Sequence, residues 1–534
     1  MSEHYSSNVI YVYLMNEKAS RTDLSTLPIT ALHIRYDNDD ATRNELLEGL
    51  SFVVAKISDK KIDAIILRED VFDKLKAQIT DENLMEFTAI LPIFSLQDLI
   101  CTYLANSTTS TTNATVNYVL WSFDSVTTDT YGVYNGQLVN GATYSSSSTT
   151  LPYLGQGHAL SVAASQNQSF QVSTPFLNLA STSFTVEAWI YSTIVTGDNG
   201  LMGQCQCTSC SNQCFHFLIR SSKLYVGFTL NDINGLTTIT VGTWYHVAFV
   251  YNSVTQQQIL YLNGVQDNIK SSSSAYQGTN GTFTIGSASY FPVTTFFNGY
   301  IDNVKIETRA KSATEILTAA SLIAYYSFDL PYPTHDNGPN GLNGSSTNAA
   351  TVTGRVNQAM QFTGSSSYFQ AYGFYQAGFG VYSNKPFSIA LWISVSSYSS
   401  CAFVQMSSFY NTTPCFNMLG IWSYTNNAAQ LVAQGYAWPA IYGPPITLNT
   451  WTHISWTFSL TNGYRLYVNG VYFGTTGYYS YTGTSTVINW LQIGYNFACS
   501  SIYITNAAFQ GTIDEIYVYN REITATEVYE LANP

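Results

Sequence analysis

The pattern of apolar and polar residues along the chain changes near residue 118. Beyond that point, short runs rich in Val, Ile, Tyr, Phe and Thr are separated by Gly, Asn and Ser turns. This pattern is typical of an antiparallel sandwich or barrel. Before it, strands are predicted at NVIYVYLM (8–15), ALHIRY (31–36) and DAIILRE (63–69), and helices at ATRNELLEGLSFVVAKI (41–57) and DVFDKLKAQI (70–79).

The strand-rich part repeats itself. Five segments recur in the same order at separations of 203 to 212 residues: WSFD121–124 with YSFD326–329, FTVEAWI184–190 with FSIALWI387–393, TWYHVAFVY243–251 with TWTHISWTF450–458, LYLNGV260–265 with LYVNGV466–471, and FNGYIDNVKI297–306 with FQGTIDEIYV509–518. An ordered repeat of about 200 residues predicts two tandem copies of one two-sheet sandwich. The Asn-Gly pair in each LYxNG segment predicts a tight type I′ hairpin turn.

The density of charged residues marks the first domain boundary. Residues 1–100 hold 10 of the 20 Lys and Arg and 17 of the 33 Asp and Glu. We therefore predict a small α/β segment of unassigned role over 1–103, a Ser/Thr-rich linker over 104–117, and sandwiches over 118–317 and 318–534. The last two domains make the chain mainly β.

The repeated landmarks resemble the laminin-G-like jelly-roll domains of the concanavalin A-like lectin/glucanase superfamily. The opening SFD, the FTVEAW strand, the GTWYHVA strand, the LYLNG hairpin and the closing GYIDNVKI before a short Glu-bearing helix carry this resemblance. It implies two tandem antiparallel jelly-rolls. The superfamily includes carbohydrate-binding modules, adhesion domains and glycosidases, so the fold does not choose the function.

The composition argues against two kinds of interaction, with nucleic acid and across a membrane. The net charge of −13 and pI near 4.9 argue against nucleic acid, whose phosphates require clustered Lys and Arg. No apolar run reaches the length of a membrane span, because Gln97 and Asp98 interrupt the best candidate, residues 87–105.

Two signals on the compartment disagree. The start MSEHYSSNVIYVYLMNEKAS lacks the basic and long apolar regions of a signal peptide. Seven of the eight cysteines, however, fall in the β-rich part, which indicates an oxidising environment. We therefore expect an extracellular or cell-surface protein. Acceptor sequences for N-glycosylation occur at Asn106, Asn113, Asn167, Asn280, Asn343 and Asn411.

The positions of the acidic residues indicate whether the chain can be a glycosidase, because such an enzyme needs two carboxylates beside the scissile bond. No Asp or Glu occurs between Asp336 and Asp514, so the second copy lacks a pair over most of its length. In the first copy Glu187 has Ala390 as its counterpart. We predict no catalytic residues. His246 and His453 lie in apolar strands without a nearby nucleophile, and we interpret them as structural.

Repeated aspartates are the candidate metal ligands, because calcium prefers carboxylate and carbonyl oxygens. The matched positions are Asp124 and Asp329, Asp129 and Asp336, and Asp302 and Asp514. The alternative is that these side chains accept hydrogen bonds from turn backbone and bind nothing. A calcium ion, if bound, is expected to join the opening-loop Asp to the G-x-I-D Asp. No other cofactor is expected.

Cysteines 205, 207, 210 and 214 stand in one short loop. Zinc is an alternative, but the spacing lacks paired C-x2-C knuckles, and disulfides suit a hairpin better. Nested pairing, Cys205 with Cys214 and Cys207 with Cys210, fits best of three connectivities. A further disulfide is predicted between Cys401 and Cys415 in the comparable loop of the second copy, and the partner of Cys499 is undetermined.

Loop aromatics of the second copy are the candidate ligand-binding residues. Exposed rings stack on sugar faces, and these candidates are Tyr436, Trp438, Tyr442, Tyr478, Tyr479 and Tyr481. Ordinary loop packing is the alternative. The sequence thus predicts a non-enzymatic extracellular binding or adhesion protein that recognises glycans or proteins. A carbohydrate-active enzyme or its targeting module, and a structural matrix protein, are the alternatives.

Overall fold

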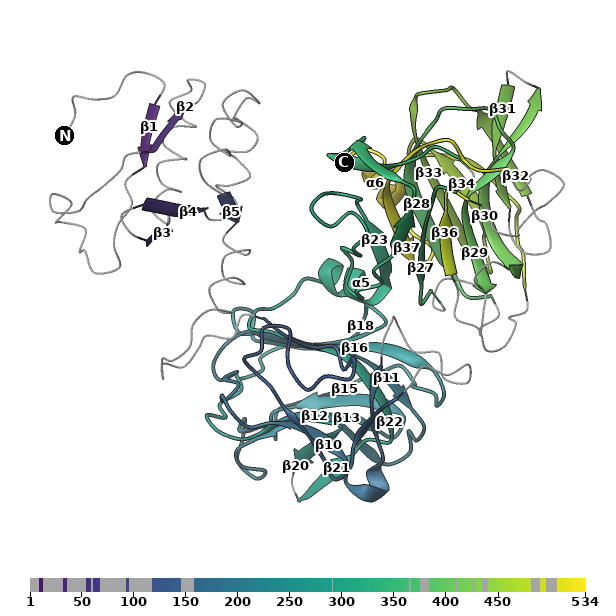
Figure 1. Cartoon of the computed structure of the whole chain (residues 1–534). Coiled ribbons are helices and arrows are strands. Elements are labelled where there is room, and N and C mark those ends of the chain that lie inside the picture. The colour runs from purple at the N-terminus through teal and green to yellow at the C-terminus, as the bar shows by residue number, and fades with distance from the viewer. Residues whose placement is uncertain are drawn as a thin grey trace. The chain divides into compact units, whose positions relative to one another are not determined.

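The computed structural model describes ten stretches of the β-rich part, together with five short strands nearer the start. The stretches are residues 118–145, 158–290, 292–364, 366–374, 384–409, 412–425, 428–434, 440–481, 490–495 and 507–534. The chain divides into two compact units, Met1–Thr112 with Tyr131–Val133, and Asn113–Thr130 with Tyr134–Pro534. Figure 1 draws the β-rich unit from blue through green to yellow.

The first unit contains short strands near three predicted positions. β1 (Val9–Val12) pairs with β2 (Leu32–Arg35), β3 (Val54–Ser58) pairs with β4 (Lys61–Leu67), and β5 (Ile93–Ser95) runs parallel to β4. The strands predicted within 8–15, 31–36 and 63–69 are confirmed by β1, β2 and β4. The helix predicted over 41–57 is wrong at its end, where the apolar residues pair with β4 as β3. The rest of that helix, and the one at 70–79, lie outside the described residues.

The first jelly-roll is built from two antiparallel sheets. The order of one is β15-β14-β13-β12-β19-β10-β7; that of the other is β18-β17-β16-β11-β22-β9-β8, with β6 also paired to β22. The strands are β6 (Tyr118–Trp121), β7 (Gln137–Val139), β8 (Thr143–Ser145), β9 (Ala159–Val162), β10 (Ser169–Val172), β11 (Phe184–Ser192), β12 (Asp198–Cys205), β13 (Cys214–Arg220), β14 (Lys223–Gly227), β15 (Asp232–Asn234), β16 (Trp244–Asn252), β17 (Gln257–Leu262), β18 (Val265–Lys270), β19 (Phe283–Ile285) and β22 (Gly299–Glu307).

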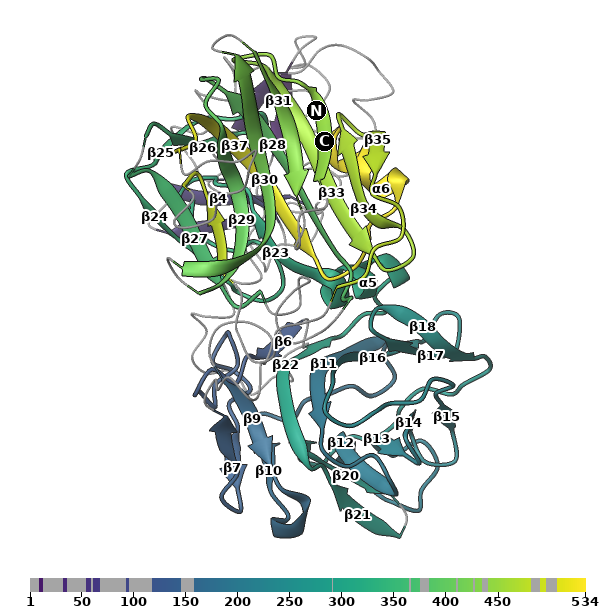
Figure 2. The same cartoon turned by 90° about the vertical axis from the view of Figure 1, so that its right-hand side faces the viewer.

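The second jelly-roll repeats this topology. Its sheets have the orders β32-β31-β30-β29-β36-β27-β24 and β35-β34-β33-β28-β37-β26-β25, with β23 paired to β37. The strands are β23 (Leu322–Tyr326), β24 (Ser345–Thr347), β25 (Ala350–Thr353), β26 (Gln358–Phe362), β27 (Tyr368–Tyr372), β28 (Phe387–Val395), β29 (Cys401–Phe409), β30 (Thr412–Thr425), β31 (Ala428–Gln434), β32 (Ala440–Pro445), β33 (Trp451–Ser459), β34 (Gly463–Val468), β35 (Val471–Thr475), β36 (Trp490–Ile493) and β37 (Gly511–Tyr519). Figure 2 shows both sheets of this copy.

Each strand of the second copy therefore has a counterpart at the same place in the first. The predicted tandem duplication is confirmed at the level of strand order. The first copy also has a hairpin of β20 (Ser287–Tyr290) and β21 (Val293–Phe296). The segment that corresponds to it in the second copy falls largely outside the described residues.

Equivalent aromatic residues hold the two cores together. In the first copy Phe184 packs on Phe215 and Phe249 at ring distances of 5.7 and 5.9 Å. In the second, Phe387, the counterpart of Phe184, packs on Trp456 at 5.6 Å. The repeated tryptophans behave differently: Trp189 and Trp244 are buried in a small separate cluster that lies outside the main core.

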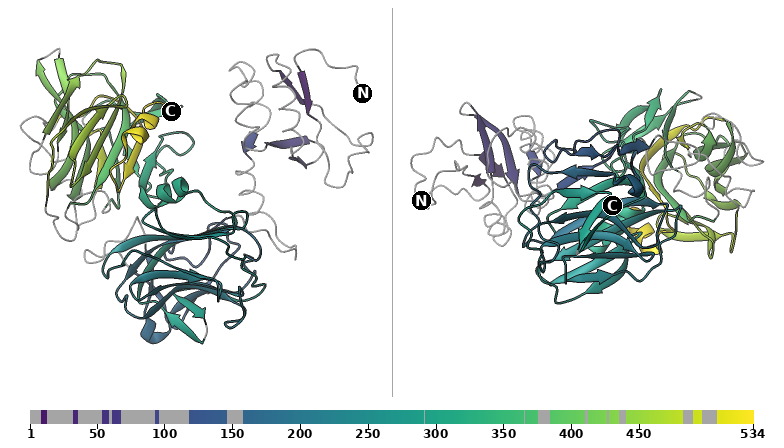
Figure 3. Two further views of the ribbon diagram at one scale, coloured as in Figure 1. Left: turned by 180° about the vertical axis from the view of Figure 1, so that it is seen from behind. Right: turned by 90° about the horizontal axis from the view of Figure 1, so that it is seen from below.

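The predicted hairpin turns and closing helices are confirmed. Asn263–Gly264 and Asn469–Gly470 have positive φ angles of 50° and 81°, and 48° and 78°, as a type I′ turn requires. α5 (Ala313–Ser321) follows β22, and α6 (Ala525–Leu531) follows β37. Each helix begins with a capping box. Figure 3 shows both helices from behind. None of the helices in the described part of the chain is long and apolar enough to cross a membrane.

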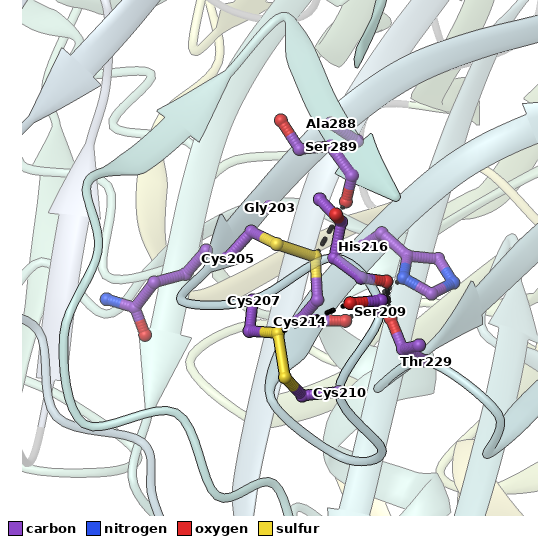
Figure 4. Close-up of a disulfide and its surroundings, with 12 residues drawn as sticks. Gly203, Cys205, Cys207, Ser209, Cys210, Cys214, His216, Thr229, Ala288 and Ser289 are labelled. Carbon is purple, nitrogen blue, oxygen red and sulfur yellow. Dashed lines mark hydrogen bonds between the residues drawn. A yellow bond between two sulfur atoms is a disulfide. The ribbon is translucent and has the colours of Figure 1, made fainter. Parts of the chain in front are cut away.

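The disulfides of the first copy have the predicted nested pairing. Cys205 bonds to Cys214 across β12 and β13, and Cys207 bonds to Cys210 within the loop that joins them. Figure 4 shows the two bonds at the end of this hairpin.

The disulfide predicted at Cys401 is wrong, because Cys401 is a free, buried thiol. Cys401 stands opposite Ile421 in the β29–β30 pair, and Cys415 stands opposite Ser407. Six residues along a strand span about 20 Å. A disulfide needs Cα atoms within about 7 Å. The two cysteines share a hairpin but lie too far apart along it.

Replacing Cys205 and Cys214 together by alanine should lower the free energy of unfolding by about 2–3 kcal/mol, because the bond closes a loop of some ten residues. The matched control replaces Cys207 and Cys210, whose shorter loop should give a smaller loss. Urea titrations of the two double variants and the parent chain measure the difference. A larger loss in the Cys207 and Cys210 variant would contradict the assigned roles.

Candidate functional site

The seven-stranded sheet of the second copy carries no charged residue in any of its strands. The sequences of β24, β27, β36, β29, β30, β31 and β32 contain neither Asp, Glu, Lys nor Arg. The equivalent sheet of the first copy contains Asp198, Arg220, Lys223 and Asp232. Since side chains alternate across a strand, one face of this uncharged sheet packs on the core and the other faces outward.

Glutamines form a row on the outward face, called here the amide row. Gln370 of β27 stands opposite Gln492 of β36, which stands opposite Gln405 of β29. After Met418 on β30, the same row reaches Gln434 on β31. Their strand neighbours, among them Phe369, Leu491, Val404 and Ala433, belong to the core. The register therefore collects four amides that are far apart in sequence.

The amide row is only partly satisfied by its own members. Gln405 Nε2 donates to Gln492 Oε1, and the hydroxyl of Ser407 donates to the same oxygen at 3.3 Å. Four amide atoms are buried without a hydrogen-bond partner: Oε1 of Gln370, Gln405 and Gln434, and Nε2 of Gln492. A buried polar atom without a partner costs about 1–3 kcal/mol. Gln405, Gln434 and Gln492 are each 1% exposed, so these atoms lie inside the protein and are not open to solvent.

Aromatic residues lie on both sides of the amide row. Tyr372 and Trp490 face each other across β27 and β36, with ring centroids 5.0 Å apart. On the other side, Trp422 packs on Tyr442 at 5.8 Å and on Tyr424 at 6.0 Å. Tyr424 and Tyr442 are 48% and 39% exposed, so rings remain open to solvent. Together with the amide row these five aromatic residues form the amide–aromatic face.

The predicted loop aromatics separate into different environments. Tyr442 belongs to the amide–aromatic face. Tyr436 and Trp438 lie outside the described residues, in the connection between β31 and β32. Tyr478 is 71% exposed, whereas Tyr479 packs partly against the core. Tyr481 is a correction: it is buried in the core and its hydroxyl donates to the Lys385 carbonyl at 2.8 Å, so it cannot contact a surface ligand.

The first copy has the same face, but it is covered. The row equivalent to the amide row passes through Gly203 and His216, and the β20–β21 hairpin lies over it. Cys214 Sγ is 2.9 Å from the Ser289 carbonyl oxygen, and a Cβ on Gly203 would lie 3.5 Å from the Ala288 Cα. Figure 4 shows Ala288 and Ser289 beside these residues.

Charges on this covered face are paired with one another. Arg220 makes two hydrogen bonds to Asp198, at 2.8 and 2.9 Å, and Tyr290 of the hairpin donates to the same carboxylate. His216 Nε2 lies 3.3 Å from Asp232 Oδ1. The hairpin and these pairs close this face of the first copy.

The repeated aspartates of the second copy mainly anchor backbone. Asp336 accepts from the amides of Tyr325, Gly338 and Leu342 at 2.7–2.8 Å. Asp514 Oδ2 accepts from two amides of the β25–β26 turn at 2.8 and 2.9 Å, and Asp329 Oδ1 accepts from one amide at 2.9 Å. These contacts agree with the turn-anchoring alternative for the aspartates of this copy.

In the first copy the charge of one candidate calcium ligand acts on another. The pKa of Asp302 is raised well above its usual value, first by burial and second by the charge of Asp124. Asp129 instead accepts from the Tyr134 amide at 2.6 Å. Within the described stretches, no group of three or more His, Cys, Asp or Glu residues is arranged to hold a metal. Two carboxylates fall short of the six to eight oxygens that calcium takes. Calcium between Asp124 and Asp302 stays a prediction.

Calcium bound between Asp124 and Asp302 should relieve their repulsion and raise the melting temperature of the chain. A chelator should then lower that temperature in the parent chain but not in an Asp302→Asn variant. Differential scanning calorimetry with and without calcium measures both. Equal melting of the parent chain in calcium and in chelator would remove this ion from the account.

Glu187, the one strand carboxylate that suggested catalysis, is locked in an ion-pair cluster. Its Oε1 lies 2.6 Å from Lys311 Nζ, and its Oε2 lies 3.5 Å from His246 Nε2. Lys311 also approaches Glu307 at 3.2 Å. Although burial opposes ionisation, the charges of His246 and Lys311 lower the pKa of Glu187. A buried, ionised and paired carboxylate suits a structural role.

The repeated histidines are buried and have lowered pKa values. Burial lowers the pKa of His246 to about 4, although the charge of Glu187 opposes the shift, and burial lowers the pKa of His453 to about 3. Each ring packs edge-on against the tryptophan of the neighbouring strand, at 5.3 Å from Trp189 and 5.2 Å from Trp392. These contacts support the interpretation of both histidines as structural.

Acid should therefore destabilise the second copy through His453. The folded state keeps this ring neutral, whereas the unfolded chain binds a proton below about pH 6.5. The stabilisation is complete above that pH and is lost toward pH 3, by up to about 1.4 kcal/mol per pH unit. In urea titrations between pH 7 and pH 4, His453→Gln should lose less stability than the parent chain. The control His335→Gln replaces an exposed histidine and should follow the parent; identical slopes for all three proteins would refute the assignment.

Comparison with known proteins agrees with the observed architecture. The family model of the concanavalin A-like lectin/glucanases superfamily matches residues 163–317 and 363–529, one stretch in each copy. A search of curated protein sequences found no match.

Several solved structures match this chain at low similarity. Domain 4 of the extracellular arabinanase AbnA from Geobacillus stearothermophilus, in complex with arabinotriose, is 21% identical, with 40% of this chain and 98% of that chain covered and a TM-score of 0.30. Domains LG4-5 of the mouse laminin alpha1 chain are 11% identical over 70% of this chain and 93% of that chain, with a TM-score of 0.25. Trypanosoma rangeli sialidase is 12% identical over 60% of each chain, with a TM-score of 0.32.

Proposed function

This chain belongs to the concanavalin A-like lectin/glucanases superfamily, and we propose that it is a non-enzymatic extracellular protein that binds glycans through the amide–aromatic face of its second copy. The observation that carries the proposal is the cluster of Trp422, Tyr424 and Tyr442, two of whose rings are open to solvent, on a sheet whose strands carry no charged residue. In the first copy the equivalent face is covered by the β20–β21 hairpin.

The chemistry of this face suits a polyhydroxylated ligand. Aromatic rings provide a large apolar area with little side-chain entropy to lose, and sugars present apolar C–H faces for stacking. The phenol groups of tyrosines can both donate and accept hydrogen bonds with the sugar hydroxyls. Binding sites of this kind combine apolar walls with a few placed polar groups.

The carboxylates support the non-enzymatic part of the proposal. Hydrolysis of a glycosidic bond usually requires two carboxylates roughly 5–10 Å apart on either side of it. The amide–aromatic face has none, and Glu187 in the first copy is held by Lys311 and His246. We expect no release of reducing sugar from any polysaccharide that the protein binds.

The extracellular part rests on the disulfides. Cys205–Cys214 and Cys207–Cys210 close a hairpin in the first copy, and such bonds persist in oxidising compartments. Three glycosylation acceptors in the described stretches, Asn167, Asn280 and Asn343, are exposed. These features fit a secreted or surface-displayed binding protein.

Glycan binding should depend on the exposed ring cluster. Trp422→Ala and Tyr442→Ala should each weaken binding to a glycan identified on an array by roughly tenfold, which corresponds to about 1.4 kcal/mol. The matched control is Tyr478→Ala, which removes a more exposed ring outside the amide–aromatic face. Isothermal titration calorimetry measures the affinities, and circular dichroism melting checks the fold of each variant.

Two results would contradict the proposal. One is the absence of any glycan bound by the intact chain on the array. The other is an equal loss of affinity in all three variants, or a loss in Tyr478→Ala alone, because the ligand would then contact another surface.

A further inference from the structure

The two nested disulfides of the first copy close the same hairpin end but lie in different surroundings. Cys205–Cys214, called here the outer disulfide, joins β12 to β13, and Cys207–Cys210, the inner disulfide, lies within the loop that the outer one closes (Figure 4). We propose that the inner disulfide is a thiol–disulfide exchange site, which small external thiols open while the outer disulfide stays intact. Such exchange is independent of glycan binding by the second copy.

The inner disulfide adds little to the constraint on the loop. Its two cysteines are three residues apart, whereas those of the outer disulfide are nine residues apart and stand opposite each other in the β12–β13 pair. The entropy that a disulfide removes from the unfolded chain grows with the length of the loop it closes. With the outer disulfide in place, the inner one encloses only a short segment of a closed loop. Opening it should therefore leave the hairpin folded.

Hydrogen bonds that involve no sulfur also hold this loop. The Gln206 amide donates to the Gln213 carbonyl at 3.0 Å, and the Asn212 amide donates to the Thr229 carbonyl at 3.1 Å. The Asn212 carbonyl in turn accepts from the Gln277 amide at 2.7 Å. None of these bonds requires the inner disulfide. After reduction its two thiols therefore remain in one held loop, where they can pair again.

The two disulfides differ in the access that they give to an attacking thiol. The cysteines of the inner disulfide are partly exposed, and the exposed residues Gln206, Ser209 and Ser211 flank them. Cys214 of the outer disulfide is fully buried, with its Sγ 2.9 Å from the carbonyl oxygen of Ser289 on β20. Exchange begins when a thiolate attacks a disulfide sulfur, so it requires access to that sulfur. The inner disulfide meets this requirement better.

Attack on the outer disulfide is disfavoured at both of its sulfurs. Cys214 is closed to solvent. Attack on the partly exposed Cys205 would release a thiolate at Cys214, inside the protein and beside the Ser289 carbonyl oxygen. A buried charge without a partner is costly. External thiols should therefore select the inner disulfide.

Ser209 indicates which sulfur of the inner disulfide leaves. Its hydroxyl oxygen lies 3.7 Å from Cys207 Sγ, and only the hydroxyl can donate, because a disulfide sulfur has no proton. An external thiolate attacks Cys210 Sγ, a mixed disulfide forms, and Cys207 leaves as a thiolate that accepts this hydrogen bond. A second external thiolate then attacks the external sulfur of the mixed disulfide and releases Cys210. Two external thiols become one external disulfide, and their two electrons and two protons pass to Cys207 and Cys210.

Timed reduction of the full, folded chain tests the exchange site. The oxidised chain is incubated with glutathione at constant pH, free thiols are blocked with an alkylating agent at successive times, and mass spectrometry with peptide fragmentation maps the labelled cysteines. We expect the inner disulfide to open at least about tenfold faster than the outer one, because its sulfurs are more accessible. Opening of both disulfides at one rate, or earlier opening of the outer one, would overturn the proposal.

Two serine variants test the leaving sulfur. Ser209→Ala should slow the opening of the inner disulfide by roughly fivefold, because the Cys207 thiolate loses a hydrogen bond. The matched control, Ser211→Ala, changes an exposed serine on the other side of Cys210 and should open at the rate of the parent chain. Equal rates for all three proteins would overturn the assignment of Cys207 as the leaving sulfur.

A single-cysteine variant traps the mixed disulfide. In Cys207→Ser, Cys210 keeps a thiol without its partner, and glutathione disulfide should convert this thiol to a lasting glutathione adduct. Mass spectrometry should find the adduct on Cys210, with Cys205–Cys214 still bonded. A variant that forms no adduct, or whose outer disulfide rearranges to Cys210, would contradict a separate and accessible exchange site.

Discussion

Side chains alternate from one face of a strand to the other, and in each copy of this jelly-roll the inward set is committed to an apolar core. That constraint fixes the positions of Phe184 and Phe387, which pack on aromatic partners at ring distances below 6 Å. Because the two copies share the order of their strands, equivalent outward positions can be compared directly. The outward faces are where the copies are free to differ.

The outward faces of the two seven-stranded sheets differ in the charge of their strand residues. In the first copy the β20–β21 hairpin lies on the sheet, where Gly200 and Gly203 leave room for its backbone. The Arg220–Asp198 pair and Tyr290 close the arrangement. In the second copy the same row consists of glutamines flanked by rings. The first copy therefore uses this face for its own packing, and the second copy has buried amides at the equivalent positions.

Much of the fold could be predicted from local patterns. The repeated WSFD, LYxNG and G-x-I-D segments contain turn and core residues whose spacing reports the strands directly, and the spacing of the four clustered cysteines suggested their nested pairing. The helix expected over 41–57 ended in a strand because pairing with β4 overrides helical spacing. Cys401 and Cys415 were predicted to share the loop comparable to the cysteine loop of the first copy, but the register of β29 and β30 separates them.

The candidate site was harder to predict, because it depends on register across strands. Gln370, Gln405, Gln434 and Gln492 are single residues in separate strands, and nothing local in the sequence joins them. The alternation Tyr-x-Gln-x-Tyr at 368–372 was the available signal. Tyr442 was found from its loop composition, and Trp422 and Tyr372 were missed because apolar residues in strands suggest a core. The tyrosines near residue 480 were ambiguous for the same reason, and Tyr481 proved to be buried.

The central claim is that one face of the second copy binds the ligand. Hydrogen–deuterium exchange of the full chain, with and without a saturating glycan, tests it without any substitution. The account predicts slower exchange in β30, β31 and β32 of the second copy and unchanged exchange in β12, β13 and β14 of the first. Protection confined to the first copy, or to the eight-stranded sheet of the second, would contradict it.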